Sequence, residues 1–388
     1  MLDAGDAVLM VLLDLSAAFD TIDHSLLLKR MEQDVGLCGS ALSWLASYLS
    51  DRKQSVCIND CISKPSNLSV GVPQGSVLGP VLFLCYILPL KDLIEQFGLH
   101  RHGYADDTQL YCKLSLKDTT LLSQQLSKVE ACLQEIRLWM CTNQLKLNDA
   151  KTEMLIISAQ RDSECAAKVT IQMGEDIVHP KKAVRNLGAV FDCHLNMARQ
   201  ISQTTCNAYY HLRRIAKIRH HLDDSACARA IHSTVTSRLD YHNGLLLGLP
   251  KTHLQKLQVA QNSAARLLTN TKKRTHITPV LAQLHWLPIE CRIKYKTLSL
   301  IHKGLHSEYA PTYLQEICKQ YIPRRTLRSS EDPWKLTVTR PNHSFGARSI
   351  LHDGARLWNS LPLFLRLPQS FQTFKKHLKT HLFSNFYN

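Results

Sequence analysis

The chain has 388 residues, of which 45% are hydrophobic and 20% charged; this composition excludes a disordered protein and leaves room for two or three folded domains. Its thirteen cysteines include no Cys-x-x-Cys pair, which argues against a secreted disulfide framework and against a zinc ribbon. The longest apolar run, Val77–Leu90, has 14 residues and two prolines, whereas a bilayer span needs about 20 residues. We therefore expect an intracellular protein of the nucleus or cytoplasm, with no membrane partner.

Net charge is +15 and is distributed unevenly along the chain. Residues 1–150 contain 12 Lys and Arg against 17 Asp and Glu, a net −5, whereas residues 151–388 contain 35 against 15, a net +20. Such a basic C-terminal part indicates a polyanionic partner, above all nucleic acid. A basic solvated surface without a partner is the alternative.

The first informative stretch is Ala7–Leu13, which is continuously apolar and is followed by Asp14. This pattern is typical of a strand buried on both faces. A charge at its end is either paired or functional. A helical pattern follows, and we interpret Asp20 and Asp23 as capping and solvated residues, with Asp23 capping the helix.

The second stretch is a Pro-Gln-Gly loop within Val70–Pro80. Pro73 fixes one backbone angle and Gly75 permits a positive φ, so Gln74 is presented on a stiff loop. Ser76 is expected to be the N-cap of a core helix that runs to Ile87, which would put Pro80 at its fourth position. A simple loop ahead of a buried helix is the alternative.

The third stretch, Tyr104-Ala105-Asp106-Asp107, lies between strand-forming residues and predicts an outward hairpin whose tight turn carries two carboxylates. Two adjacent like charges repel each other unless a cation neutralises them. Mg²⁺, which prefers oxygen ligands, is the natural candidate. The alternative is a solvated loop tip.

Periodicity predicts further elements around these stretches. The expected helices are Ser43–Leu49 and Thr119–Met140, the second of them amphipathic. The expected strands and hairpins are Gln54–Ile58, Leu145–Asn148, Glu153–Ser158 with Lys151 in the turn before it, Val169–Val178 and Val184–Asp192.

The C-terminal part is predicted to be helical and basic, with a loop-rich segment at 322–350. Its expected basic helices are Tyr209–His221, Leu254–Leu268, Ile289–Leu305 and Phe371–Phe383. Several such helices interleaved with aromatic residues favour nucleic acid over a membrane surface. His302 and His306 have ligand spacing on a helix, but no third ligand is nearby in the sequence, so a structural role is favoured.

Three motifs in this order resemble the core motifs of reverse transcriptases, and their wording is most similar to the non-LTR (LINE) retrotransposon class. They are Leu13-Asp14-Leu15-Ser16-Ala17-Ala18-Phe19-Asp20, Gly71-Val72-Pro73-Gln74-Gly75-Ser76-Val77-Leu78-Gly79-Pro80 and Tyr104-Ala105-Asp106-Asp107. Three later stretches resemble the region that follows the polymerase in such elements: Asn262–Leu268, Leu284-His285-Trp286-Leu287-Pro288 and Leu357-Trp358-Asn359-Ser360-Leu361-Pro362.

The resemblance implies an α+β fold: a palm with a ferredoxin-like antiparallel sheet in residues 1–192, a helical thumb-like region in 193–270, and a basic helical region in 271–388. It implies an RNA-directed DNA polymerase that takes an RNA template, a DNA primer and dNTPs. It also implies two Mg²⁺ ions, with Mn²⁺ as a possible substitute.

The resemblance assigns roles to individual residues. Asp14 and Asp106 match the metal ligands, and Asp107 matches the supporting carboxylate of the metal site. Lys151 falls where the family often has a lysine near the triphosphate, a candidate proton donor to pyrophosphate.

Other positions match the substrate contacts of the family. Phe19 matches the aromatic residue that fills the space of a ribose 2′-hydroxyl. Gln74 and Gly75 match residues that contact the incoming nucleotide, and Gln74 also matches the template contact. Leu187 and Gly188 resemble the primer-grip turn.

The sequence departs from the family pattern at its beginning, because a fingers region does not fit into the 13 residues before Asp14. We therefore expect an N-terminally truncated copy or a fragmentary gene model, and we expect the chain as given to be a poor polymerase. Two alternatives stay open: a catalytically silent remnant that retains only nucleic-acid binding, and an unrelated structural protein with a chance Asp-Asp turn.

Overall fold

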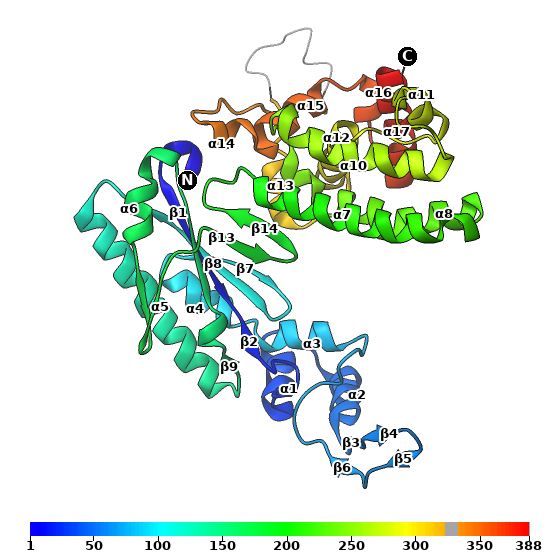
Figure 1. Cartoon of the computed structure of the whole chain (residues 1–388). Coiled ribbons are helices and arrows are strands. Elements are labelled where there is room, and N and C mark those ends of the chain that lie inside the picture. Colours follow the sequence, from blue (N-terminus) through cyan, green and yellow to red (C-terminus); the bar gives the residue numbers. More distant parts are fainter. Residues whose placement is uncertain (323–332, 388) are drawn as a thin grey trace. The chain divides into compact units, whose positions relative to one another are not determined.

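The computed structural model describes residues 1–322 and 333–387 and divides the chain into two compact units. The first unit is Asp6–Leu187, and the second consists of Gly188–Asn388 together with Leu2–Gly5. Figure 1 shows the helices and strands of each unit. The prediction of a chain with both helices and sheet is confirmed.

A four-stranded antiparallel sheet forms the centre of the first unit, in the order β10-β1-β8-β7. Figure 1 labels three of its strands, β1, β7 and β8. Its strands are β1 (Ala7–Leu13), β7 (His100–Tyr104), β8 (Asp107–Leu114) and β10 (Glu153–Ile157). Along β1 the side chains alternate between buried and half-buried. The prediction of burial on both faces is therefore wrong, because an antiparallel sheet needs only one face against the core.

The helix α5 (Thr119–Thr142) confirms the predicted amphipathic helix. Val129, Leu133 and Ile136 recur every three or four residues and are buried in the same hydrophobic core as the side chains of β1. At its start the Asp118 carboxylate accepts a hydrogen bond from the Leu121 amide at 3.0 Å, which satisfies one of the free N–H groups of the first turn.

The remaining elements of the first unit are short. Its other α-helices are α1 (His24–Gln33), α2 (Gly39–Leu49), α3 (Gly79–Tyr86), α4 (Leu90–Gln96) and α6 (Ser163–Lys168). Its other strands are β2 (Leu15–Ser16), β3 (Lys53–Gln54), β4 (Cys57–Ile58), β5 (Cys61–Ile62), β6 (Ser66–Asn67), β9 (Lys146–Leu147), β11 (Ile171–Met173), β12 (Asp176–Val178) and β13 (Ala183–Asn186). The 3₁₀ turns are η2 (Asp149–Lys151) and η3 (Gln160–Asp162).

A buried arginine connects three of these helices. Arg30 in α1 donates hydrogen bonds to the Tyr86 carbonyl at the end of α3 and to the Asn143 side chain beyond α5. The Tyr86 hydroxyl donates to the Asn143 carbonyl at 2.7 Å. Burial lowers the pKa of Arg30, and these partners compensate for the lost hydration of its guanidinium.

The second unit is helical, and the four predicted basic helices correspond to α7, α10, α12 and α17. Its helices are α7 (Ala198–Ile218), α8 (Asp224–Ile231), α9 (Ser237–Asp240), α10 (Lys251–Thr269), α11 (Ile277–Gln283), α12 (Ile289–His306), α13 (Thr312–Ile317), α14 (Ser344–Ala347), α15 (Ala355–Asn359), α16 (Leu363–Arg366) and α17 (Phe371–Tyr387). Shorter elements are η1 (Leu2–Ala4), β14 (Ala189–Asp192), η4 (Arg219–His221), η5 (His232–Thr236), η6 (Asn243–Leu246) and η8 (Ile350–Gly354).

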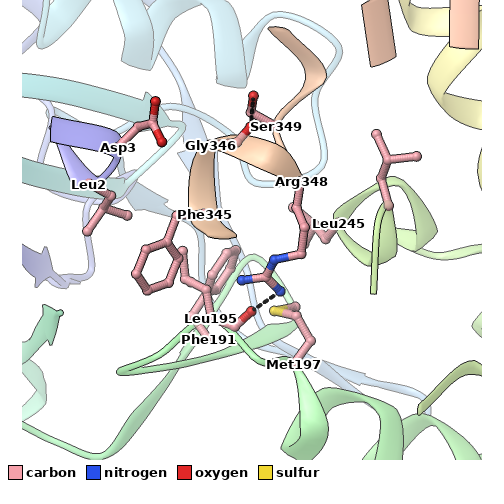
Figure 2. Close-up of a pocket in the computed structure, with 11 residues that line it drawn as sticks. Leu2, Asp3, Phe191, Leu195, Met197, Leu245, Phe345, Gly346, Arg348 and Ser349 are labelled. Atoms are coloured by element: carbon pink, nitrogen blue, oxygen red, sulfur yellow. Dashed lines mark hydrogen bonds between the residues drawn. The ribbon is translucent and has the colours of Figure 1, made fainter. Parts of the chain in front are cut away.

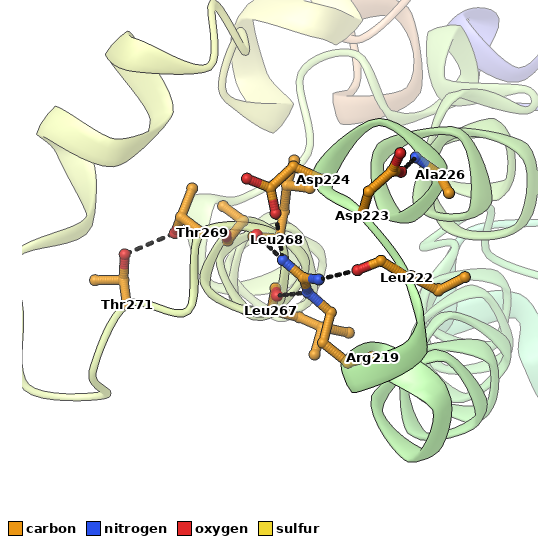
Figure 3. Close-up of polar contacts among 10 residues, drawn as sticks. Arg219, Leu222, Asp223, Asp224, Ala226, Leu267, Leu268, Thr269 and Thr271 are labelled. Carbon is orange, nitrogen blue, oxygen red and sulfur yellow. Dashed lines mark hydrogen bonds and ion pairs between the residues drawn. The ribbon is translucent and has the colours of Figure 1, made fainter.

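Arg219 joins α7, α8 and the end of α10 (Figure 3). Its guanidinium donates to the Leu267 and Leu268 carbonyls at 3.1 and 2.9 Å and lies 2.5 Å from the Asp224 carboxylate. Carbonyls in the last turn of a helix have no partner within the helix, and a cation there is also favoured by the helix dipole. Arg219 therefore caps the C-terminal end of α10.

Residues near the start of the chain pack within the second unit beside a cavity of about 320 Å³ (Figure 2). The Asp3 carboxylate accepts hydrogen bonds from the Asn342 and His343 amides at 2.9 and 2.8 Å. Arg348 lines the cavity and donates to the Leu195 carbonyl at 2.9 Å. The guanidinium thus has a partner, and most of the remaining lining is apolar.

Two of the predicted strands are not continuous. Gln54–Ile58 is interrupted: β3 ends at Gln54, β4 begins at Cys57, and the side chains of both are exposed, so no buried face holds one continuous strand. Val184–Asp192 is not one strand, because Leu187 and Gly188 have φ of +46° and +82° and turn the chain between β13 and β14. Residues 322–350 were predicted to be rich in loops. Residues 323–332 of this segment lie outside the described residues.

His302 and His306, for which the sequence favoured a structural role, both lie in α12. His302 is buried, and its ring stacks on Phe374 with centroids 4.0 Å apart. Burial lowers the pKa of His302 to about 4, so it is neutral at ordinary pH. Over residues 1–322 and 333–387, no group of three or more His, Cys, Asp or Glu side chains is arranged to hold a metal ion.

All thirteen cysteines lie among the described residues, and none forms a disulfide. No helix in the described part of the chain is both long and apolar enough to cross a membrane.

Candidate active site

Strand register brings the predicted carboxylates to one end of the sheet. In the β1–β8 pair Leu13 lies opposite Thr108, so Asp14 follows β1 where Asp107 begins β8. In the β7–β8 hairpin Tyr104 pairs with Asp107, which leaves Ala105 and Asp106 as the turn. The backbone therefore carries Asp14, Asp106 and Asp107 to the same end of the β1–β8 pair.

The hairpin turn differs from the expectation in one detail. Its left-handed residue is Ala105, with φ of +52°, and Asp107 is already part of β8. We predicted both carboxylates in the turn. Asp106 lies there, but Asp107 does not, so the prediction is wrong for Asp107. A left-handed alanine costs about 1 kcal/mol relative to a glycine, and such strain is often found at functional sites.

The carboxylates influence one another electrostatically. Burial raises the pKa of Asp107, and the negative charges of Asp106 and Asp14 raise it further. The Lys151 ammonium lies 3.3 Å from Oδ2 of Asp14. That oxygen is enclosed by the protein and accepts no hydrogen bond there, so the contact is an ion pair without hydrogen-bond geometry.

The donor set fits Mg²⁺ in its chemistry, because three carboxylates supply the hard oxygen ligands that this ion prefers. Burial raises the pKa of Asp107, and so do the charges of Asp106 and Asp14, which a cation would neutralise. As the described side chains lie, however, they do not form a group of three that could hold a metal, and Lys151 faces Asp14 instead.

Lys151 lies in η2, the 3₁₀ turn between β9 and β10. The turn is fastened to the site, because the Asn148 amide donates to the Asp14 carbonyl at 2.9 Å. Next to this hydrogen bond, Leu15 of β2 pairs with Leu147 of β9. This pairing carries Lys151 to Asp14 although the two lie far apart in the sequence.

The Pro-Gln-Gly loop packs against the segment that contains Phe19. The Val72 amide donates to the Phe19 carbonyl at 2.8 Å, and the Phe19 ring contacts Phe83 with centroids 4.9 Å apart. Gly75 has φ of +77°, as predicted. The structure therefore places Phe19 and Gln74 on adjoining segments.

Asp20 is a residue whose role the sequence did not predict. The Gln74 side chain donates to Oδ1 and Oδ2 of Asp20 at 2.9 and 3.0 Å. Asp23, by contrast, caps α1, because it accepts from the Leu26 amide at 2.8 Å. Asp20 is exposed, as predicted for a solvated residue, but it does not cap a helix: its carboxylate accepts a hydrogen bond from a side chain 54 positions away.

The start of α3 also differs from its prediction. Ser76 is not the N-cap: its hydroxyl accepts from the Gly79 amide at 3.0 Å, but the helix begins at Gly79. Pro80 therefore lies in the first turn rather than at the fourth position, which suits a residue without an N–H.

The predicted primer-grip residues Leu187 and Gly188 form the turn at which the two units divide. Within the first unit, Gln109 of β8 donates to the Asn186 side chain at 2.7 Å, so the end of β13 is tied to the central sheet. Within the second unit, a Cβ on Gly188 would lie 3.1 Å from the Tyr241 ring. Both the positive φ and this contact favour glycine.

Comparison with known proteins identifies the first half of the chain. The family model described as reverse transcriptase (RNA-dependent DNA polymerase) matches residues 2–191. A probable RNA-directed DNA polymerase from transposon BS of Drosophila melanogaster is 23% identical over 326 residues, which is 82% of this chain and 34% of the relative. An RNA-directed DNA polymerase from the mobile element jockey of Drosophila funebris is 28% identical over 196 residues, 49% of this chain and 20% of the relative.

The chain thus spans about a third or less of the length of these relatives. Among solved structures, telomerase from Candida albicans, in complex with a fragment of telomeric RNA, aligns with a TM-score of 0.32 and 11% identity, over 80% of this chain and 50% of that one. Residues 2–191 therefore belong to the reverse transcriptase family, a nucleotidyltransferase family, and are of the LINE type, similar to the RNA-directed DNA polymerases of these transposons.

Proposed function

We propose that the first unit is a reverse transcriptase palm that adds deoxynucleotides to the 3′-hydroxyl of a DNA primer on an RNA template. Asp14 and Asp106 are the ligands of two Mg²⁺ ions, or of Mn²⁺, and Asp107 supports them. The observation that carries this proposal is the register of β1 and β8, which leads all three carboxylates to one end of the sheet. A cation bound beside these carboxylates would offset the negative charges that, together with burial, raise the pKa of Asp107.

The bound ions would activate the primer hydroxyl and neutralise the charge of the phosphates. The protein supplies the other components. Asp14 and Asp106 hold negative charge at fixed positions, because each directly follows or precedes a paired strand. Lys151 holds a proton 3.3 Å from Asp14 and is the candidate donor to the leaving pyrophosphate.

Phe19 and Gln74 position the incoming nucleotide. The Phe19 ring is supported by Phe83, so it can exclude a ribose 2′-hydroxyl by steric contact. Gln74 is oriented by Asp20 and would contact the nucleotide and the template, with Gly75 allowing the bend of the loop. Leu187 and Gly188 would support the primer end. The second unit, with its helical thumb and basic C-terminal region, would contact the nucleic acid through phosphates.

The test is primer extension by the full chain on poly(rA) with an oligo(dT) primer, in Mg²⁺ and in Mn²⁺. Asp106→Ala should abolish incorporation. Asp92→Ala, which removes an exposed carboxylate from α4 of the same unit, should retain it.

Nucleotide incorporation by the Asp106→Ala variant would contradict the assignment of Asp106 as a metal ligand. A folded wild-type chain that extends no primer with either ion contradicts the polymerase function, and nucleic-acid binding by a catalytically silent remnant then becomes the better function.

A further inference from the structure

The backbone on both sides of the turn η2, which carries Lys151, is fixed by pairing. Before the turn, the Asn148 amide donates to the Asp14 carbonyl, and after it Glu153 pairs with Leu12 in the central sheet. The Lys151 side chain, however, is 69% exposed, so packing alone does not hold its ammonium 3.3 Å from Oδ2 of Asp14. The position of the ammonium therefore depends on the conformation of the turn itself.

A second ion pair holds the middle of this turn. Arg137 of α5 donates through Nη2 to Oδ2 of Asp149, the first residue of η2, at 2.7 Å. The other carboxylate oxygen of Asp149, Oδ1, is buried and accepts no hydrogen bond from the described residues. Within residues 1–322 and 333–387, Arg137 is thus the side chain on which this carboxylate depends for a polar partner.

The Arg137 guanidinium has a second neighbour that limits its movement. The β11–β12 hairpin turns at Gly174, and a Cβ on that residue would overlap Nη1 of Arg137. The hairpin is tied to the same helix as the arginine, because the Gln172 amide donates to Oε1 of Glu130 at 2.8 Å. The hairpin turn and the bond to Asp149 together restrict the positions that the guanidinium can take.

Loss of Arg137 would leave a poorly hydrated carboxylate without a partner. The Asp149 side chain is only 24% exposed. A charged group that loses its partner in such surroundings recovers its solvation by moving toward water. Asp149 and Lys151 belong to the same three-residue turn, so a shift of the first moves the backbone of the second. The Lys151 ammonium would then lie farther from Asp14.

We infer that Arg137 is a positioning residue: by pairing with Asp149, it holds η2 in the conformation that keeps the Lys151 ammonium beside Asp14. The consequence for catalysis rests on the proposed role of Lys151 as the proton donor to pyrophosphate, whereas the geometry does not. Arg137 is 43% exposed, and ion pairs with this degree of exposure contribute little to global stability. Its effect is therefore local to the turn.

The first experiment measures this geometry without catalysis, by carbodiimide cross-linking of the full chain in EDTA. The reagent joins a carboxylate to an amine that contacts it, and mass spectrometry quantifies the Lys151–Asp14 product. Arg137→Ala should lower the yield of this product by about threefold or more, because the stranded carboxylate displaces the turn. The Lys113–Asp6 product, whose atoms lie 2.9 Å apart in the same unit, should be unchanged.

Two further variants control this measurement. Arg161→Ala removes an arginine from the same unit whose carboxylate partner, Asp162, lies outside η2, so it should leave both products unchanged. Arg137→Lys keeps a cation that can pair with Asp149 and should retain more of the Lys151–Asp14 product than Arg137→Ala. An unchanged yield in Arg137→Ala, or an equal loss in Arg161→Ala, would overturn the inference.

The second experiment relates the geometry to the proposed chemistry. In primer extension, Arg137→Ala should lower kcat by about tenfold and leave the KM for dNTP within about twofold, because it disturbs the proton donor rather than nucleotide binding. In a Lys151→Ala chain the same substitution should have little further effect, since the group that Arg137 positions is absent.

The two backgrounds separate positioning from a general structural role. Equal losses of kcat from Arg137→Ala with and without Lys151 would show that the arginine acts independently of the lysine and would overturn the inference. A wild-type chain that extends no primer would contradict the proposed function instead, and the cross-linking yields would still decide whether Arg137 positions the Lys151 ammonium.

Discussion

The two units distribute charge in opposite ways. Asp6–Leu187 has 18 Lys and Arg against 21 Asp and Glu, a net −3, and collects three carboxylates at one end of its sheet. The rest of the chain has 29 against 11, a net +18, and spreads this charge over helices. A concentrated negative site suits small cations, whereas a broad positive surface suits a long polyanion. The comparison supports the proposal that the first unit carries out the chemistry and the second unit holds the nucleic acid.

Burial also affects titratable groups differently in the two units. In the first, burial and neighbouring carboxylates raise the pKa of Asp107. In the second, burial lowers the pKa of His302 to about 4. In both cases the charged form is disfavoured, but only the charge of Asp107 could be recovered by binding a cation.

The largest expected effect concerns the acidic end of the sheet. Asp14→Asn keeps the size of the side chain but removes the charge that a metal ion would need, so primer extension should fall by about 1,000-fold or more. The pKa of Asp107 should move down toward its usual range, because one of the charges that raise it is gone. Steady-state incorporation and an NMR titration measure the two effects. Asp92→Asn is the control, and an Asp14→Asn variant with more than a tenth of wild-type activity would contradict the metal role.

The next largest effect is an opposite pH dependence of stability in the two units. The folded pKa of His302 lies below the ordinary 6.5, so its stabilisation is complete above about pH 6.5 and is lost as the pH falls toward about 4. The loss should be on the order of 3 kcal/mol in the second unit. Asp107 acts with the opposite sign: its raised pKa lets the first unit gain stability as the pH falls through that pKa.

Hydrogen exchange of each unit between pH 7 and 4 measures this difference. His302→Leu should reduce but not abolish the response of the second unit, because burial also lowers the pKa of His232, His242 and His306. His377→Leu, at an exposed position of α17, should leave the response unchanged. A second unit whose stability is independent of pH would show that His302 is accessible to protons in the folded state.

A third effect tests nucleotide selection in the first unit. Phe19→Ala should reduce the preference for dNTP over rNTP by roughly 10- to 100-fold, because the space for a 2′-hydroxyl opens. It should also lower stability by removing the contact with Phe83. Phe97→Ala, in a partly buried residue of the same core, should lower stability without changing the preference. Competition between dTTP and rUTP measures selection, and an unchanged ratio would remove Phe19 from this role.

The smallest expected effect concerns the hydrogen bonds between Asp20 and Gln74. Asp20→Ala should raise the KM for dNTP by about tenfold with a smaller change in kcat, because Gln74 loses its orientation but the carboxylates remain. Asp20→Asn, which can still accept one hydrogen bond from Gln74, should restore part of the affinity. A KM that is unaffected by Asp20→Ala would make this contact purely structural.

Elements set by local patterns could be predicted from the sequence. Thr119–Thr142 repeats apolar side chains every three or four residues, and Asp23 stands where a helix needs an acceptor for its first amides. The three motifs also identified the reverse transcriptase domain, because their residue types and order are specific.

Contacts between distant segments were decided only by the tertiary structure. The Gln74 bonds to Asp20, the ion pair of Lys151 with Asp14, and the turn at Leu187 each depend on how separate strands and loops pair. Helix periodicity and capping involve neighbours within a few residues, so they can be read along the chain. The register between strands and the partner of a side chain arise from packing of the whole core, where many pairings compete and only the folded arrangement selects one.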